Sequence, residues 1–121
     1  MKTTNVIERV RQRREFASTE AAEEVTAATL EALGRTVPDG DAHDVAVELP
    51  PELARRLRSV EDRASTASVD EFLAYVHENA SVREVGVEWK VSGVFDVLEE
   101  TVGEEFDDVQ AQLPEEYERL Y

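Results

Sequence analysis

The chain has 121 residues, of which 28 are acidic and 13 basic, for a net charge of −15 at pH 7. This length suits one domain with its own core, and the absence of cysteine excludes disulfides and thiolate metal sites. No apolar run approaches the roughly 20 residues of a membrane-spanning helix, and the first residues lack the apolar run of a signal peptide. We therefore expect a single domain over residues 1–121, located in the cytoplasm and not in a membrane.

The charge is uneven and comes from an unusual set of residues. Only Lys2 and Lys90 are lysines, and the other basic residues are arginines. Residues 1–63 hold 10 basic and 13 acidic residues, a net charge of −3, whereas residues 64–121 hold 3 and 15, a net charge of −12. The 41% apolar fraction argues against disorder. We expect a folded, halophilic protein of a high-salt cytoplasm, where salt screens self-repulsion; the alternative is an acidic protein of an ordinary cytoplasm.

The first forty residues predict two helices and a turn. Residues 5–16 form the first helix. Its apolar stripe consists of Val6, Ile7 and Val10. Ser18 or Thr19 caps the second helix, which runs to about Val37. Residues 38–41 then read as a stop and a turn, because they combine proline, glycine and aspartate.

A corner motif follows, and it occurs twice. Residues 44–52 and 108–116 both read D-V-x-x-x-L-P-x-E, with an offset of 64 positions. The residue before a proline leaves the helical region, and a proline fits the first turn of the next helix. Each copy therefore predicts a short helix that ends near Leu49 or Leu113 and a second short helix after the proline. Two copies at a fixed offset indicate an internal duplication.

Residues 82–102 are compatible with two structures. Alternation with polar residues at Val85, Val87, Trp89 and Val91 is typical of a strand. A helical series also runs through the segment, and it consists of Val87, Val91, Val94, Phe95, Leu98 and Val102. The duplication favours the helix, because the first copy has no strand character there. Gly103 is expected to end this helix, and Asp70 to cap the preceding one, which runs to about Glu78.

The predicted fold class is all-α: a compact orthogonal bundle of about eight helices, built from two similar four-helix repeats. The repeats span about residues 5–60 and 69–121, with a linker at about 61–68. Each repeat is too small to bury its own faces, so we expect one shared core. Ala28 and Gly93 correspond in the two repeats and are expected to let the two long helices approach closely.

The second corner, Glu105–Tyr117, together with Trp89–Val91 and Val94–Leu98, resembles domain-of-unknown-function family two-two-six-seven. The resemblance covers nearly the whole chain and is weaker in the first corner. It implies a compact helical bundle with a globin-like outline and fits a member from a halophilic archaeon. It implies no reaction and no functional residues.

Sites for metals, cofactors or catalysis are not expected. His43 and His77 are the only histidines, and neither has a second histidine at helical spacing, so both are interpreted as surface residues. A haem would need an axial ligand that faces an apolar pocket. The acidic clusters at residues 39–44 and 104–108 do not have the spacing of a calcium loop. Neither a nucleophile elbow nor a glycine-rich phosphate loop occurs, so an enzyme is not the favoured class.

The arginines of the first helix are the candidate interaction patch, which consists of Arg9, Arg11, Arg13 and Arg14. Arg55, Arg56 and Arg58 could extend it. The patch could meet phosphates or an acidic protein surface. We favour the alternative that these arginines pair with the acidic half of the same chain. The large aromatic residues are expected in the core: Trp89, Phe95, Tyr117 and Tyr121.

The favoured function is a non-enzymatic module that acts through protein contacts, with an unknown partner or as a homodimer. The first alternative is a small-ligand or metal-binding protein, possibly an enzyme, which would need a closed pocket with convergent polar groups. The second is a nucleic-acid-associated regulator, which a net charge of −15 opposes.

Overall fold

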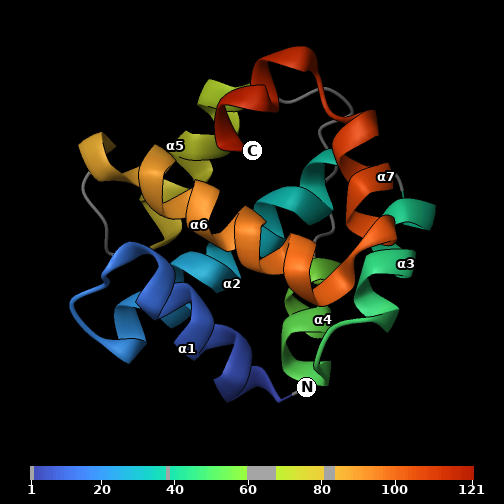
Figure 1. Cartoon of the computed structure of the whole chain (residues 1–121). Helices are drawn as coiled ribbons and strands as arrows, with labels where there is room; N and C mark the ends of the chain where they lie inside the picture. The colour runs from blue at the N-terminus through green and yellow to red at the C-terminus, as the bar shows by residue number, and fades with distance from the viewer. Residues whose placement is uncertain (1, 38, 60–67, 81–83) are drawn as a thin grey trace.

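The computed structural model describes residues 2–37, 39–59, 68–80 and 84–121, and every regular element in them is helical. The first four helices are α1 (Thr3–Arg14), α2 (Thr19–Thr36), α3 (Asp39–Val47) and α4 (Pro51–Arg58). The next four are α5 (Val69–Asn79), α6 (Glu84–Val102), α7 (Glu104–Gln112) and the 3₁₀ helix η1 (Glu115–Leu120) (Figure 1). The all-α prediction is confirmed. The described part of the segment at 82–102 is a helix, as the duplication predicted.

The helix ends follow local chemistry, with two corrections. Ser18 accepts a hydrogen bond from the Ala21 N–H at 3.1 Å and caps α2, as predicted. The prediction that Asp70 caps α5 is wrong: the cap is Ser68, which exchanges hydrogen bonds with Glu71 in a capping box. Because a serine followed three positions later by a glutamate satisfies two backbone donors, this pair prevails over the aspartate.

The other correction concerns the turn predicted at residues 38–41. Helix α3 already begins at Asp39, so residues 39–41 are helical. Carboxylates are favoured in the first turn of a helix, because they interact with the positive end of its dipole. The aspartates of residues 39–41 therefore allow α3 to begin at Asp39. Pro38 and residues 61–67 of the linker predicted at about 61–68 lie outside the described part of the chain, whereas Ser68 is the cap of α5.

Both proline corners form where the motif places them. Helix α3 ends at Val47 and α4 begins at Pro51, with Pro50 at its cap position. Helix α7 ends at Gln112, and Pro114 occupies the cap position of the next helix. That last helix is 3₁₀ rather than α. A helix of six residues provides few consecutive hydrogen bonds, and short helical segments often take the 3₁₀ form.

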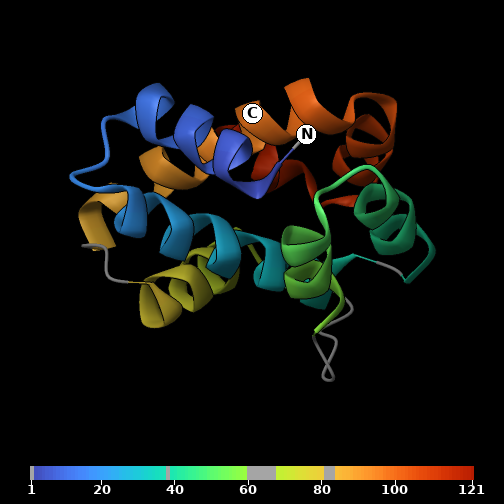
Figure 2. The same cartoon turned by 90° about the horizontal axis from the view of Figure 1, so that it is seen from below.

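The two long helices, α2 and α6, organise the packing. Helix α2 contacts α1, α3, α4, α5 and α6, whereas α6 contacts α1, α2, α5, α7 and η1. Figure 2 shows α1 and α6 along one side of the molecule and α2 and α5 along the other. At one end α3 packs against α7. Among the described helices, none combines the length and apolar character needed to cross a bilayer.

The centre of the core is an aromatic cluster around Phe95 of α6. Its ring lies edge-on to Phe72 and Phe106, with centroids 5.9 and 5.4 Å away, and stacks on Tyr121 at 6.2 Å. Tyr117 is buried against Phe72 at 5.5 Å, and its hydroxyl donates to the Ser68 carbonyl at 3.1 Å. Phe95 and Tyr117 are therefore core residues, as predicted.

The other two aromatic predictions are wrong. Trp89 is 61% exposed and Tyr121 is 46% exposed. Trp89 fits the alternating series of a strand, but in a helix two positions correspond to a rotation of about 200°. It therefore lies on the opposite side of α6 from Val87 and Val91, which are both buried. Tyr121 follows η1 directly, and its ring stacks on Phe95 while nearly half of the residue stays exposed.

Candidate interaction surface on α1 and α6

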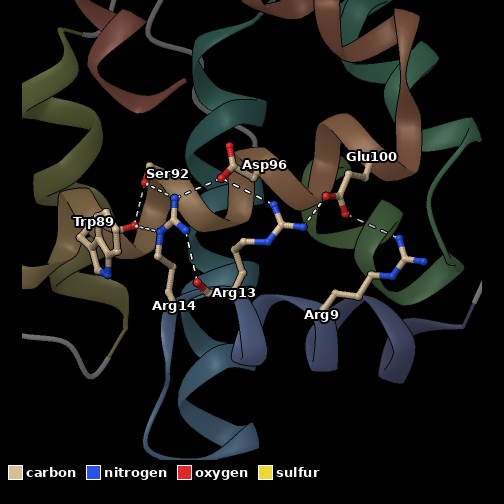
Figure 3. A network of polar contacts seen from close by, with 7 residues as sticks. All are labelled: Arg9, Arg13, Arg14, Trp89, Ser92, Asp96 and Glu100. Atoms are coloured by element: carbon tan, nitrogen blue, oxygen red, sulfur yellow. Dashed lines mark hydrogen bonds and ion pairs between the residues drawn. The ribbon is translucent and has the colours of Figure 1, made fainter.

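Helix α6 presents a polar stripe to α1. Ser92, Asp96 and Glu100 recur every four residues, which places them on one helical face. Arg9 and Arg13 have the same spacing on α1, and Arg14 is the last residue of that helix. Positive charge at a helix C-terminus also interacts favourably with the helix dipole. The two stripes therefore meet with opposite charges (Figure 3).

Arg13 lies between two carboxylates of α6. Its guanidinium bonds to Glu100 and lies 3.7 Å from the Asp96 carboxylate, and Arg9 lies 3.8 Å from Glu100. The hydrogen bond that Arg13 donates to the Glu100 carboxylate raises the pKa of Arg13. These side chains are a third to a half exposed, so each pair contributes at most about 1 kcal/mol, and less in salt.

Arg14 is held more firmly than its neighbours. Its side chain is only 14% exposed and donates to the Trp89 carbonyl, the Ser92 hydroxyl and the Asp96 carboxylate, each at 3.1 Å. It also donates to the Arg13 carbonyl at 3.2 Å. The guanidinium carbon lies 4.2 Å from the centroid of the Trp89 ring, within the range of a cation–π contact. Arg14 therefore ties the end of α1 to the first half of α6.

Gly93 makes room for Arg14. A Cβ atom at position 93 would lie 2.3 Å from Cγ of Arg14, which is closer than atoms can approach. The expectation that Gly93 brings the two long helices together is corrected here, since the space at Gly93 is taken by a side chain of α1. Helices α2 and α6 do pack together, and Ala28 is buried. The close contact at Gly93, however, is between α1 and α6.

Trp89 borders a surface hollow of about 360 Å³. We call this the Trp89 surface; it consists of Arg14, Glu88, Trp89, Ser92, Asp96, Arg119 and Tyr121. Arg119 bonds to Glu88 at 2.5 Å and lies 3.7 Å from Asp70. The Tyr121 hydroxyl donates to the Gln110 carbonyl at 3.1 Å. An exposed indole thus lies among side chains that are themselves fixed by contacts within the chain.

The remaining candidate arginines lie elsewhere. Arg11 bonds to Glu8 of its own helix at 3.0 Å. On α4, Arg56 lies 4.0 Å from Glu31, and Arg58 lies 3.4 Å from His43. The structure thus brings Arg9, Arg13 and Arg14 to α6. As a patch for an external partner, the four arginines of α1 stay a prediction.

The titratable residues of the other sequence candidates do not converge. His43 is exposed, and His77 is half-buried on α5. Within residues 2–37, 39–59, 68–80 and 84–121, histidines and carboxylates form no group of three or more that could hold a metal ion. A hollow of about 730 Å³ lies between α2 and α4, but its charged walls carry both signs. They consist of Glu20, Glu23, Glu24, Glu52, Arg55 and Arg56.

One carboxyl group has a shifted acidity. Glu99 of α6 faces Asp107 of α7, and the Oε2 atom of Glu99 is buried. Burial, followed by the contact with Asp107, raises the pKa of Glu99 above its ordinary value. Its neighbour Glu100 points instead to Arg9 and Arg13. Adjacent glutamates therefore have opposite electrostatic environments.

The family model of an uncharacterized conserved protein, DUF2267, matches residues 3–120. The chain belongs to the DUF2267 family. The match covers the corner motifs, the α1–α6 contact and the Trp89 surface, so the whole fold described above is that of a family member. In a comparison with curated proteins, none matches this chain.

The contact between Arg14 and Gly93 in this DUF2267 protein predicts that Gly93→Ala changes stability in opposite directions with and without the Arg14 side chain. Gly93→Ala should destabilise the wild type by about 1–3 kcal/mol, because the added methyl displaces Arg14. In an Arg14→Ala background the same change should stabilise by up to about 1 kcal/mol, because alanine favours a helix more than glycine does. Urea denaturation followed by circular dichroism measures both. Gly86→Ala is the control, since nothing lies within 4 Å of its added Cβ. Equal effects of Gly93→Ala in the two backgrounds would contradict this contact.

The raised pKa of Glu99 predicts a pH effect on stability. The folded state holds the proton to a higher pH than the unfolded state, so stability falls as pH rises through the raised pKa. Glu99→Gln should therefore stabilise the protein at pH 7 and flatten the decline above pH 4.5, the ordinary pKa. Thermal unfolding between pH 4 and 8 measures this. Glu100→Gln is the matched control and should destabilise, because it removes the ion pairs to Arg9 and Arg13.

Proposed function

We propose that this DUF2267 protein is a non-enzymatic module that acts by binding a protein partner at the Trp89 surface. The observation that supports this most is the exposure of Trp89 at 61% beside buried core positions of the same helix. Exposing a large apolar ring to water is unfavourable, so a partner that covers the ring would gain free energy from its burial. Tryptophan, tyrosine and arginine are also the residues that contribute most to binding at protein interfaces, and all three border this hollow.

The fixed geometry of the surface favours binding. Arg14 is held by four hydrogen bonds, and Arg119 and Tyr121 also have partners within the chain. A partner that binds there has little side-chain entropy to remove, because these groups are already ordered. By contrast, a small-ligand site would use an enclosed apolar cavity, and the hollow between α2 and α4 is walled by charged side chains. Ion pairing of three α1 arginines with α6 also leaves less positive charge for phosphates, which supports the expectation that nucleic acid is not the partner.

Two matched variants test the proposal. The whole chain is immobilised and exposed to an extract of its source cells in molar KCl, and the bound proteins are identified by mass spectrometry. We expect at least one protein to be captured by the wild type and by Val47→Ala, and lost with Trp89→Ala. Val47 is 62% exposed on α3, so this control removes a similar exposed apolar group far from the hollow along the chain. The same set of bound proteins for all three baits would overturn the proposal.

We also infer that the fold arose by duplication and that its two halves form a two-fold arrangement. If α1 corresponds to α5 and α2 to α6, the contact of α1 with α6 corresponds to that of α5 with α2, and both are present. The contacts of α2 with α4 and of α6 with η1 correspond in the same way. The matching proline corners support this inference. Failure of α1–α4 to superpose on α5–η1 in a crystal structure would contradict the two-fold arrangement. The globin-like outline that the family resemblance implies stays a prediction.

The charge supports a salt-adapted, cytoplasmic protein from a halophile. Residues 64–121 carry a net charge of −12, and α1 offsets only part of it. We expect the melting temperature to rise by at least ~5 °C between 0.5 and 2 M KCl, the shift that about 1 kcal/mol produces in a domain of this size. Screening alone is nearly complete at 0.5 M, where the Debye length is about 4 Å. A plateau below 0.5 M KCl would indicate an ordinary acidic protein.

A further inference from the structure

We propose that the partner contributes a basic amphipathic segment that lies in a groove made of the Trp89 surface and an adjoining hollow. This inference rests on the proposed function and names the chemistry of the partner's contact. The adjoining hollow has a volume of about 430 Å³ and lies between α5, α6 and η1. Its walls consist of Asp70, Leu73, Ala74, His77, Glu78, Val87, Glu88 and Arg119.

The two hollows adjoin and are treated as one groove, because two residues line both of them. Glu88 and Arg119 border both, and their ion pair separates the hollow around Trp89 from the hollow on α5. Helix α6 packs against both α5 and η1 (Figure 1). The residues that line the two hollows therefore lie on neighbouring helices. A segment that crosses the Glu88–Arg119 pair would therefore contact Trp89 on one side and Ala74 of α5 on the other.

The charges of the groove favour a cationic segment. Its lining has four carboxylates, Asp70, Glu78, Glu88 and Asp96, and two arginines, which gives a formal net charge of −2. Arg119 is bonded to Glu88 with Asp70 nearby, and Arg14 is bonded to Asp96. In a high-salt cytoplasm attraction over longer distances is screened, so these carboxylates would act on basic side chains that lie in direct contact with them.

The apolar groups of the groove favour an amphipathic segment over a purely basic one. Trp89 and Ala74 are exposed, and Tyr121 is partly exposed beside the indole. Apolar side chains that recur along one face of a segment would cover these groups, and arginine or lysine beside them would meet the carboxylates. A second copy of this chain fits less well, because two surfaces of the same negative charge repel each other.

A peptide titration tests the inference, with Trp89 as its own reporter because it is the only tryptophan. The probe is a 14-residue peptide of repeating Leu-Lys-Lys-Leu, added to the whole chain in 0.5 M KCl. We expect saturable binding with a shift of Trp89 emission to shorter wavelength. The charge-reversed peptide of repeating Leu-Glu-Glu-Leu should produce no shift.

Two variants with the same change of net charge separate the groove from general attraction. Glu78→Arg changes an exposed wall of the groove, whereas Asp108→Arg changes an exposed position of α7 outside both hollows. We expect Glu78→Arg to weaken peptide binding at least tenfold and Asp108→Arg to weaken it less than twofold. Equal weakening by both variants, or no saturable binding to the wild type, would overturn the inference.

The same variants distinguish failure of this inference from failure of the proposed function. If a captured partner is lost with Trp89→Ala but binds Glu78→Arg and wild type equally, the module binds a partner that is not a basic segment in this groove. If Trp89 emission shifts with protein concentration alone and sedimentation shows a dimer, the occupant is a second copy. Either result would overturn the inference while the interaction function stands.

Discussion

The extended contact of Arg14 with α6 is the constraint on which the α1 side of the fold depends. Arg14 is an almost buried cation, and burying a charge is favourable only when its hydrogen-bonding groups are satisfied. Two of its acceptors are the Trp89 carbonyl and the Asp96 carboxylate, so the register of α1 against α6 is defined by one side chain. Because Gly93 lacks a Cβ, the chain of Arg14 can lie directly on α6. The guanidinium also covers part of the Trp89 ring, which lies on the outer side of α6.

The packing brings a helix of the less acidic half of the sequence against a helix of the more acidic half. The arginines of α1 belong to the half with a net charge of −3, and α6 belongs to the half with −12. Because α1 packs beside α6, its arginines lower the repulsion among the carboxylates of α6. Each exposed pair is weak, so the effect comes from the joint placement of Arg9, Arg13 and Arg14. At Glu99, burial and the neighbouring Asp107 raise the pKa instead.

Much of the fold could be predicted because it follows from local rules. Helical periodicity identified the buried face of α6, and the prolines located both corners. The cap at Ser68 was also visible in the sequence as a serine three positions before Glu71, and the competing aspartate obscured it. The site was harder to predict because it depends on which helices meet. The arginine stripe and the carboxylate stripe are both readable, but the space at Gly93 is defined only by the contact between α1 and α6.

The position of Trp89 links the fold to the proposed function. The apolar face of a surface helix covers only part of its circumference. In α6 that face consists of buried valines, Phe95 and Leu98. Trp89 adds nothing to that core, yet its backbone carbonyl and ring both contact Arg14. A tryptophan that contributes only to stability would be expected to bury its ring. An exposed ring that rests against an ordered arginine side chain is suited to be covered by another molecule. The structure therefore separates residues that form the core from residues that are available for contact, although both lie on the same helix.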